Sequence, residues 1–562
     1  MKKTFLLLII SISFLLLLFG YFNIQILNFS QWNPKAKNNS LRKIDIFAPR
    51  GIIYDSDTNI LVENQTIYDL SIIPFDAKEN FDFKTLSDIV NIPENEIRTR
   101  VDIIKFSNVT KFHPQIIKRN LDFETKSKIE EFRLDMPGIM FNDFPARSYQ
   151  KKSRLTHVIG YLSDASNNRD NIEKYIDGDV YGISGIERVY ENELKGDNGI
   201  EYHVFDSYGI DQGESDHIDS IKPIEGTSIY TTIDNDLQHH AEKLLDNRKG
   251  SIICMNPNNG DILTMVSGPD YDLKSFIGPV PIEIWHELAN DSINKPLINK
   301  SIGEIYPPGS IYKIIAIAAA LEEKKIHLEE SVYCNGRYKY GNRYFSCWKE
   351  DGHGMVNMYD AIKFSCNSYF YELASENKID FSKWYEVGSK FGFGKRTGVD
   401  LIGESQGNIP TDIPSYQKGQ YLNYIIGQGD VLTTPLQIVS LMNILANNGI
   451  YNKPRINKNN NTKEVDVGIS SETIDQINNM IKRVVYENDG TGHVSHIEGY
   501  DIYGKTGTAE NRGDPHSWFS GFIDIDGEKL SVVVIVENAG KGSEVAAPIA
   551  KSVFQFYIDK LL

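Results

Sequence analysis

The sequence lacks a basic stripe, because no stretch gathers Lys and Arg, and acidic residues outnumber basic ones. The 562 residues include 59 Lys and Arg against 76 Asp and Glu, which gives a formal net charge of −17 at pH 7. Phosphate binding needs clustered basic side chains, so we do not expect nucleic acid as a partner. The acidic excess is what a solvated protein surface carries.

Internal repeats are also absent, and cysteine is rare, with four residues. The composition is 41% hydrophobic and 11% aromatic, which supplies enough apolar surface for a core and argues against a disordered or fibrous chain. Because 562 residues are too many for one compact core, we expect at least two domains.

An uncharged apolar run from Thr4 to Phe22 follows Lys2 and Lys3. At a helical rise of about 1.5 Å per residue, it is long enough to cross a bilayer. A cleaved signal peptide is the alternative, but its apolar core is shorter and ends at a small-residue site. We therefore expect an uncleaved anchor and cytoplasmic tip within residues 1–25, with the rest of the chain outside the membrane.

The sequence pattern of the part outside the membrane changes once, near residue 228. Residues 26–228 mix short strands with charged helices, and their last stretch, 206–228, is polar and aperiodic, as in a linker or an exposed hairpin. Residues 229–562 contain two hairpin patterns and end in an expected helix, Glu544–Leu562. The hairpins are expected to turn at Asn258 to Gly260 and at Asp526 and Gly527. We take 26–228 and 229–562 as two domains, the second a sheet flanked by helices.

Ser310 and Lys313 lie in YPPGSIYKIIAIAAALEE, where Pro307 to Gly309 break regular structure and an apolar helix begins. Residues three apart share one helical face. A serine needs a base to become a nucleophile at neutral pH, and a lysine desolvated by an apolar helix can have its pKa lowered enough to serve. The pair alone also fits a capped surface helix.

Two further motifs follow, Ser365-Cys366-Asn367 and GKTGTAE. The second joins a fixed cation, a glycine that permits close backbone approach, and two hydroxyls for a carboxylate or an amide. These are Lys505, Gly507, Thr506 and Thr508. KTGT alone also fits a polar strand end. The three motifs in this order are the set of penicillin-binding proteins and class A β-lactamases.

The sequence accordingly resembles a class B penicillin-binding protein over nearly its whole length. Further segments that look like family segments are FAPRGIIYDSDTNILV, GISGIERVYENELKGDNG, PLINKSIGEIYPPGSIYK, GQGDVLTTPLQ and HSWFSGF. Within the class, the likeness favours the elongation-specific group, penicillin-binding protein 2, and the septal paralogues are the alternative. The implied fold is α+β, with one transmembrane helix, an elongated mixed α/β pedestal of the dimerisation type, and a transpeptidase domain whose antiparallel sheet is flanked by helices.

The implied reaction is D,D-transpeptidation of peptidoglycan stem peptides, in the class of the serine-type D-Ala-D-Ala carboxypeptidases. Ser310 would attack the carbonyl between the last two D-alanines with Lys313 as base. An amine of a neighbouring stem would take the acyl group. Backbone N–H groups of Ser310 and Thr508 would form the oxyanion hole. β-Lactams would acylate Ser310.

The same resemblance assigns the remaining motif residues. Ser365 would relay protons and Asn367 would orient the substrate amide. Lys505, with Thr506 and Thr508, would bind the terminal carboxylate of the substrate.

Three of the four cysteines, Cys334, Cys347 and Cys366, fall in one window that also contains His353. Three thiols and one imidazole make a full tetrahedral set for a structural Zn²⁺ site. A disulfide between Cys334 and Cys347 is the alternative in an oxidising compartment, and unlinked residues are a third interpretation. We expect zinc, because elongation-type members often carry such a cluster. Cys254 lies in a predicted strand and is expected to be a core residue.

The resemblance also implies a location and partners. The chain would be a single-pass protein of the bacterial inner membrane, with its catalytic domain on the periplasmic side. It would work with a SEDS-family glycan polymerase and other elongation-complex proteins, because class B proteins lack a polymerase domain. A binding or scaffold module without turnover and a β-lactamase are the other classes considered. The intact motif residues count against the first, and the anchor and pedestal count against the second.

Overall fold

The first element of the computed structural model is α1, Lys2–Phe22, which continues through a π-helical turn, Asn23–Leu27. The structure describes residues 2–30, 41–77, 81–105, 114–165, 175–176, 178–205, 211–215, 218–278, 280–414 and 418–562. Lys3–Leu27 is apolar and long enough to cross a membrane, and none of its hydrophobic window is buried against protein. The expected apolar helix is therefore present, and its exposed side chains suit a lipid environment.

The chain forms two compact units, each built from separated segments. Unit 1 comprises Met1–Gly51, Asn64–Ala146 and Lys195–Thr227, and unit 2 comprises Ile52–Glu63, Arg147–Leu194 and Ser228–Leu562. The predicted domains were contiguous ranges, whereas unit 2 also contains Ile52–Glu63 and Arg147–Leu194, which lie within the predicted domain 26–228. The long final segment of unit 2 starts at Ser228, next to the predicted boundary.

Unit 1 contains an antiparallel sheet of β1 (Leu41–Ile46), β8 (Gly199–Phe205) and β9 (Asp211–Glu214). Part of the predicted linker, residues 206–210 and 216–217, lies outside the described residues, and β9 comes from the part that is described. Three helices of unit 1 pack on a separate apolar core, and they are α3 (Phe83–Val90), α4 (Glu94–Lys105) and α5 (Phe123–Glu131). The Asp82 and Asp122 carboxylates cap α3 and α5 by accepting backbone N–H bonds.

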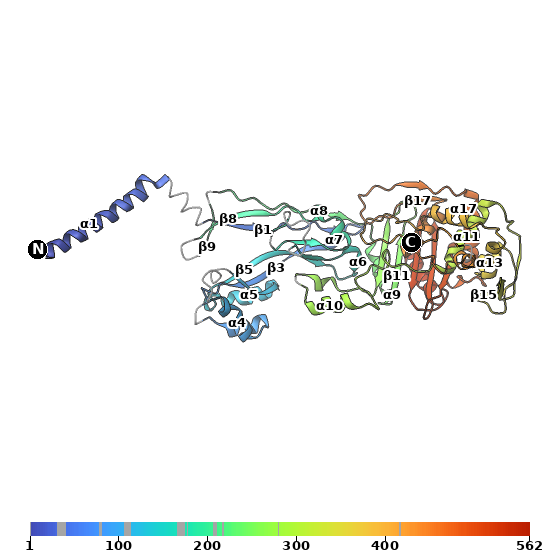
Figure 1. Cartoon of the computed structure of the whole chain (residues 1–562), viewed down its shortest axis with the longest axis horizontal. Coiled ribbons are helices and arrows are strands. Elements are labelled where there is room, and N and C mark those ends of the chain that lie inside the picture. The colour runs from blue at the N-terminus through green and yellow to red at the C-terminus, as the bar shows by residue number, and fades with distance from the viewer. Residues whose placement is uncertain are drawn as a thin grey trace. The chain divides into compact units, whose positions relative to one another are not determined.

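The main sheet of unit 2 is antiparallel and five-stranded, in the order β12-β11-β21-β20-β19. Its strand β11 is labelled in Figure 1. Its strands are β11 (Gly250–Met255), β12 (Ile262–Gly268), β19 (Ile502–Ala509), β20 (His516–Ile525) and β21 (Glu528–Val536). Asp526 and Gly527, both at positive φ, form the tight β20–β21 turn. Both predicted hairpins are therefore confirmed.

Both faces of this sheet are buried. Ile253 and Val533 belong to the core shared with α11 (Lys313–Glu323), α13 (Asn367–Ser375), α16 (Pro435–Ala446) and α17 (Ser471–Tyr486). Ile252 and Cys254, one residue out of phase, belong to the opposite core with α9 (Asn235–Leu245) and α18 (Ala546–Leu561). Successive strand residues face opposite sides, so the uninterrupted apolar runs of β11 and β21 fit a sheet covered by helices. The predicted α+β fold, the terminal helix and the core position of Cys254 are confirmed.

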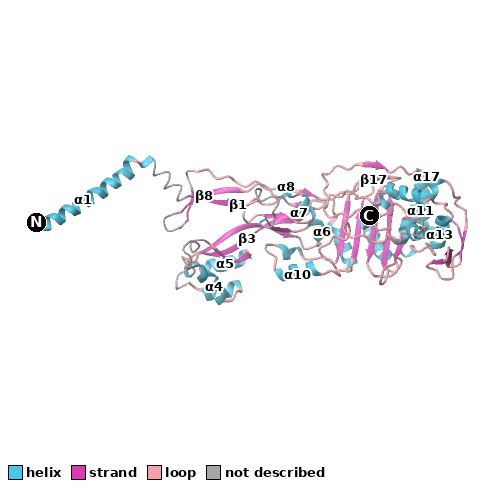
Figure 2. Ribbon diagram, in the orientation of Figure 1, coloured by secondary structure: helices cyan, strands magenta, loops and turns pink. Residues whose placement is uncertain are grey.

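The remaining helices and strands of the described residues are drawn in cyan and magenta in Figure 2. Strands are β2 (Ile53–Tyr54), β3 (Ile60–Ile72), β4 (Gln115–Leu121), β5 (Ile139–Tyr149), β6 (Leu162–Asp164), β7 (Val180–Gly182), β10 (Ile229–Tyr230), β13 (Val332–Cys334), β14 (Arg337–Tyr340), β15 (Arg343–Ser346), β16 (Gly354–Val356), β17 (Ile450–Asn452) and β18 (Glu464–Asp466). Helices are α6 (Thr156–Ile159), α7 (Gly185–Val189), α8 (Glu191–Leu194), α10 (Ile282–Asn290), α12 (Met358–Lys363), α14 (Phe381–Lys390) and α15 (Gln420–Ile425). Single 3₁₀ turns are η3 (Arg133–Asp135), η6 (Leu273–Phe276), η7 (Gly309–Tyr312) and η9 (His493–Ser495).

Candidate active site

Ser310 lies in the 3₁₀ turn η7, and Lys313 begins the α-helix that follows it. The sequence predicted a helix start at Ser310, and the structure refines this start to a 3₁₀ turn. Gly309 makes the turn possible, because its φ is +55° and a Cβ atom there would lie 2.9 Å from the Thr508 carbonyl oxygen. The close approach brings the Ser310 turn against β19, which carries the KTGT motif.

The Lys313 side chain is fully buried, and its ammonium is held by the second motif. Nζ donates hydrogen bonds to the Ser365 carbonyl oxygen at 2.8 Å, to Asn367 Oδ1 at 2.6 Å and to Ser365 Oγ at 3.3 Å. Burial lowers the pKa of Lys313 to about 8, against weaker opposing effects of Cys347 and Cys366. The predicted lysine base is therefore desolvated as expected. Within the described part of the chain, the Ser310 hydroxyl makes no hydrogen bond of its own.

Ser365 occupies a sharp reversal between α12 and α13. Its φ is +55°, an uncommon conformation for a residue with a side chain. The Cys366 N–H donates to the Ala361 carbonyl oxygen at 2.9 Å, and Cys366 then serves as the N-cap of α13. The reversal presents the Ser365 carbonyl and hydroxyl to the same lysine, which explains how two adjacent groups can contact Lys313.

Lys505, in β19, reaches the same serine from the other side. Its fully buried Nζ donates to Ser365 Oγ at 3.1 Å and to the Thr506 carbonyl oxygen at 3.0 Å. Burial, and then the charge of Lys313, hold the pKa of Lys505 well below its ordinary value. One hydroxyl thus lies between two buried amines, which is an arrangement that can pass a proton between them.

The two threonines of KTGT make different contacts. Thr506 Oγ1 hydrogen-bonds to Thr491 Oγ1 at 3.1 Å, and Thr508 Oγ1 accepts a bond from the Gly542 N–H at 3.3 Å. Gly507, between them, packs tightly, since a Cβ atom there would lie 3.0 Å from the Pro308 carbonyl oxygen. The structure brings all three motifs into one site in unit 2.

Sequence reasoning did not identify two residues at this site. Gln428 Nε2 donates to the Thr508 carbonyl oxygen at 3.4 Å, and Thr491 contacts Thr506. Gln428 lies in GQGD, a segment that matched the family pattern, so a signal was present. Thr491 follows a glycine in a polar turn, and nothing in that pattern indicates a role.

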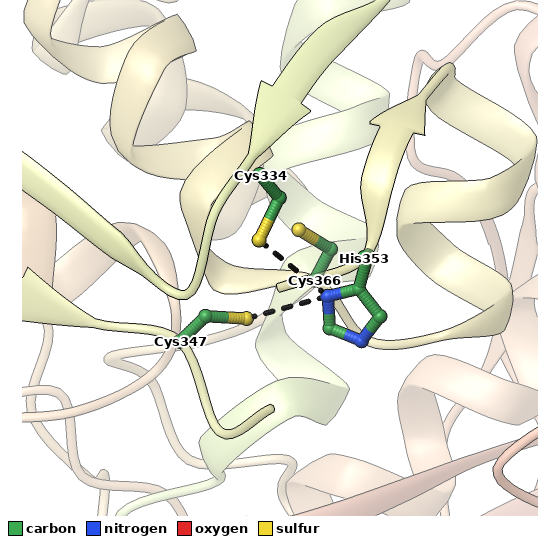
Figure 3. A group of neighbouring side chains, drawn as sticks. All are labelled: Cys334, Cys347, His353 and Cys366. Atoms are coloured by element: carbon green, nitrogen blue, oxygen red, sulfur yellow. Dashed lines mark hydrogen bonds between the residues drawn. The ribbon is translucent and has the colours of Figure 1, made fainter. Parts of the chain in front are cut away.

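The four residues of the expected metal site converge (Figure 3). Their ligand atoms all lie within 4.8 Å of one another, although they come from β13, the segment after β15, the segment before β16 and the N-cap of α13. His353 Nδ1 is 3.6 Å from Cys334 Sγ and 3.5 Å from Cys347 Sγ. All three cysteines are buried and unpaired, so the structure contains no disulfide between Cys334 and Cys347.

The chemistry of this donor set fits a tetrahedral ion. A Zn–S distance of about 2.3 Å puts two neighbouring ligand atoms roughly 3.8 Å apart in a tetrahedral site. The distances from His353 Nδ1 to the sulfurs of Cys334 and Cys347, 3.6 and 3.5 Å, are close to this value.

A hydrogen bond from Cys366 lowers the pKa of the Cys347 thiol. The same contact with Cys347, together with burial, raises the pKa of the Cys366 thiol, so Cys347 is the thiol that ionises more readily of the two. Burial opposes the charged form of His353, but its contacts with Cys347 and Cys334 together outweigh burial and raise its pKa. Metal binding would require all three thiols deprotonated and the imidazole neutral, so it would release protons. Cys366 directly follows Ser365, so the cluster also fixes the serine turn.

Two family models match separate, contiguous ranges of the chain. Residues 250–555 match the penicillin binding protein transpeptidase domain, and residues 45–231 match the penicillin-binding protein dimerisation domain. The peptidoglycan D,D-transpeptidase MrdA of Haemophilus influenzae is 30% identical over 589 residues, covering 96% of this chain and 89% of that protein.

Two solved structures share the fold. The penicillin-binding protein PBP2 in its complex with MreC, from Helicobacter pylori, gives a TM-score of 0.80 at 24% identity, covering 93% of this chain and 100% of that one. A chain of a peptidoglycan synthase complex, described as coordinating polymerization and crosslinking, gives a TM-score of 0.74 at 24% identity, covering 99% and 98%.

Proposed function

This chain belongs to the penicillin-binding protein transpeptidases, and on that premise we propose how its residues divide the reaction. It is a serine-type peptidoglycan D,D-transpeptidase of the elongation group, and it belongs to a family that β-lactams target. The observation that carries the assignment of roles is the Ser365 hydroxyl held between the buried amines of Lys313 and Lys505.

Ser310 is the nucleophile in this proposal. Lys313, once neutral, takes the proton of the Ser310 hydroxyl as that oxygen attacks the carbonyl between the two terminal D-alanines. The backbone N–H groups of Ser310 and Thr508 stabilise the oxyanion. The proton then passes through Ser365 to the leaving amine, and D-alanine departs.

The remaining motif residues bind the substrate. Asn367 orients the substrate amide, and Lys505 with Thr508 binds the terminal carboxylate. Thr506 was expected to share that contact, but it donates its one hydroxyl proton to Thr491 and has none left for the carboxylate. An amine of a second stem then attacks the acyl-enzyme and forms the crosslink. Water in place of that amine would give the D-Ala-D-Ala carboxypeptidase reaction, which is measured as free D-alanine released without crosslinked product.

Covalent labelling by a fluorescent penicillin tests the nucleophile. Ser310→Ala should abolish labelling, because the acyl bond needs the Ser310 oxygen. Ser440→Ala is the matched control, since Ser440 is buried in α16 and its hydroxyl has no hydrogen-bond partner among the described residues. Labelling that persists in Ser310→Ala would overturn the assignment. Multiple-turnover hydrolysis of a chromogenic cephalosporin would instead indicate a β-lactamase.

We also propose that Cys334, Cys347, His353 and Cys366 hold a structural zinc ion. The support is the set of three sulfurs and one imidazole nitrogen within 4.8 Å of one another. Such an ion would tie the segment from β13 to β16 to the turn that carries Ser365 and would supply folding free energy. Metal analysis of the purified protein is the direct test.

A location and partners complete the proposal. We expect α1 to anchor the chain in the inner membrane with the catalytic unit on the periplasmic side, which protease accessibility in spheroplasts would measure. We expect contacts with a SEDS-family glycan polymerase and with elongation-complex proteins. The complexes named for the two structural neighbours support this. Crosslinking in intact cells that recovers no polymerase would count against it.

A further inference from the structure

A segment that follows α17 is clamped onto Lys363, the last residue of α12. The Lys363 side chain is 8% exposed, and its Nζ lies 2.9 Å from Glu487 Oε2 and 3.3 Å from Asp489 Oδ2. The Lys363–Glu487 pair is partly shielded from water, so it holds better than an exposed pair does, whereas Asp489 is exposed and contributes less. The segment Glu487–Thr491 is thus fixed to the element that leads into the Ser365 turn.

Thr491 completes the clamp through the Lys363 backbone. Its N–H and its hydroxyl both donate to the Lys363 carbonyl oxygen, at 3.3 and 3.1 Å. The neighbouring Gly490 packs against the end of α17, since a Cβ atom there would lie 2.3 Å from the Val484 carbonyl oxygen. The position of Thr491 is therefore set by contacts on both sides.

The Thr491 hydroxyl also reaches the KTGT strand, 3.1 Å from Thr506 Oγ1. A carbonyl oxygen can only accept, so Thr491 must donate its proton to Lys363 and the Thr506 hydroxyl must donate to Thr491. The result is a directed chain of two hydrogen bonds from Thr506 to Lys363. It joins a residue adjacent to Lys505 with a residue two positions before Ser365.

These two hydrogen bonds lie beside the contact between Lys505 and Ser365, on which the proposed proton transfer depends. Lys505 Nζ and Ser365 Oγ are 3.1 Å apart, and they belong to two elements otherwise distant in sequence. Ser365 is also held at a positive φ, which costs free energy unless its surroundings enforce it. A second link between the same two elements, close to the first, would fix both the separation and the turn.

We propose that Thr491 is a positioning residue for acyl transfer, tying the Ser365 turn to the KTGT strand through Lys363 and Thr506. The inference rests on the proposed transpeptidase function and deepens it. Thr491 itself need not touch substrate. Its loss should slow the chemical step by loosening the Ser365–Lys505 contact, and it should leave the fold intact.

The test measures acylation of the full-length protein in detergent by a fluorescent penicillin, separating the saturation constant from the limiting acylation rate. Thr491→Val keeps the volume and the backbone N–H but removes both hydroxyl bonds. We expect its limiting rate to fall about tenfold or more, which is about 1.4 kcal/mol of barrier. Thr491→Ser, which restores the hydroxyl, should act within about twofold of the wild type, since the bonds are regained.

Thr473→Val is the matched control. Thr473 is buried near the other end of α17, about 17 Å along the helix from Val484, the residue against which Gly490 packs. Its hydroxyl donates to Glu322 at 2.7 Å. It should lower the melting temperature and leave the acylation rate unchanged. Thr491→Ala replaces Thr491→Val if the latter does not fold.

The outcomes separate this inference from the proposed function. A wild-type protein that penicillin does not label would overturn the proposed function, and the inference with it. A labelled wild type with an unchanged Thr491→Val rate would overturn only the inference. Failure of Thr491→Ser to restore the rate, or an equal loss in Thr473→Val, would show a general effect on stability and would also overturn it.

Discussion

Two buried lysines around one serine set the chemistry of the site at the scale of single residues. Lys313 donates three hydrogen bonds, to two oxygens of Ser365 and to Asn367, which is how an ammonium binds and a neutral amine does not. A general base must first lose this proton. Burial lowers the pKa of Lys313 to about 8, which makes that loss possible near physiological pH. Burial, and then the Lys313 charge, hold the pKa of Lys505 below its ordinary value.

Acylation should therefore depend on pH with a rising limb. Below about pH 8 most of the Lys313 amine is protonated and cannot accept the Ser310 proton, so the rate of penicillin acylation should increase with pH and level off above that value. The apparent pKa of this rising limb describes the Lys313–Lys505 pair and not one lysine alone, because the two amines interact. Stopped-flow labelling from pH 6 to 9.5, with melting temperatures at each pH as the control, measures it. A flat profile would contradict the assignment of Lys313 as base.

Turns and loops position these residues at the scale of elements. The Ser365 reversal between α12 and α13 puts a side-chain-bearing residue at φ +55°, and the cysteine cluster meets it at the next residue. Regular elements could not present the carbonyl and hydroxyl of one residue to the same amine. The reversal between α12 and α13 therefore positions both Ser365 groups for contact with Lys313.

The strain of this turn can be measured with two substitutions. Ser365→Ala and Ser365→Gly both remove the hydroxyl, so both should lose acylation. Ser365→Gly should be the more stable of the two by about 1 kcal/mol, because glycine has no Cβ penalty at positive φ. At Ser440, inside α16, the order should reverse, because alanine is the better helix former. Urea unfolding gives the comparison, and an Ala variant at least as stable as the Gly variant at 365 would refute the strain.

The cysteine cluster gives a second element-scale prediction. Cys366→Ser should reduce the bound zinc and lower the melting temperature more strongly than it slows acylation. The reason is that the ion would stabilise the turn and would not take part in the reaction. Cys254→Ser is the control, since Cys254 is buried in the opposite core of the sheet and has no such neighbours in the described part of unit 2. Mass spectrometry for metal and thermal melts with and without a chelator measure both variants. A Cys366→Ser protein that keeps its metal and its melting temperature would show that the cysteine only fills space.

The whole molecule joins a membrane-length helix to a catalytic unit with its own core. The side chains of α1 are exposed and apolar, whereas all three catalytic motifs lie in unit 2. The anchor and the chemistry therefore depend on different parts of the chain. Removal of the anchor helix should therefore leave the catalytic activity of unit 2 intact.

Deletion of residues 2–27 should release the protein from membranes without abolishing penicillin labelling. The helix carries the apolar surface that favours the bilayer, and no motif residue lies in it. Membrane sedimentation and gel fluorescence measure the two properties, with the full-length chain as the reference. A truncated protein that still sediments with membranes, or one that folds but no longer labels, would contradict this separation.

The sequence by itself determined the features that local patterns encode. The anchor, the two hairpins and the terminal helix follow from apolar periodicity and turn residues, which act over neighbouring positions. The motif residues could be assigned because the family pattern preserves residue types in order. The grouping of Cys334, Cys347, His353 and Cys366 in one window also suggested a metal site, but it could not show that the four side chains lie close together.

Tertiary structure decided what depends on contacts between distant segments. The positive φ of Ser365, the approach of Lys505 to its hydroxyl and the convergence of the cysteine cluster all join elements far apart in the chain. Thr491 gave no signal in the sequence, because a threonine in a polar turn looks the same whether or not its hydroxyl bridges two elements. Burial and nonlocal hydrogen bonds, which no short pattern specifies, assemble these residues into a site.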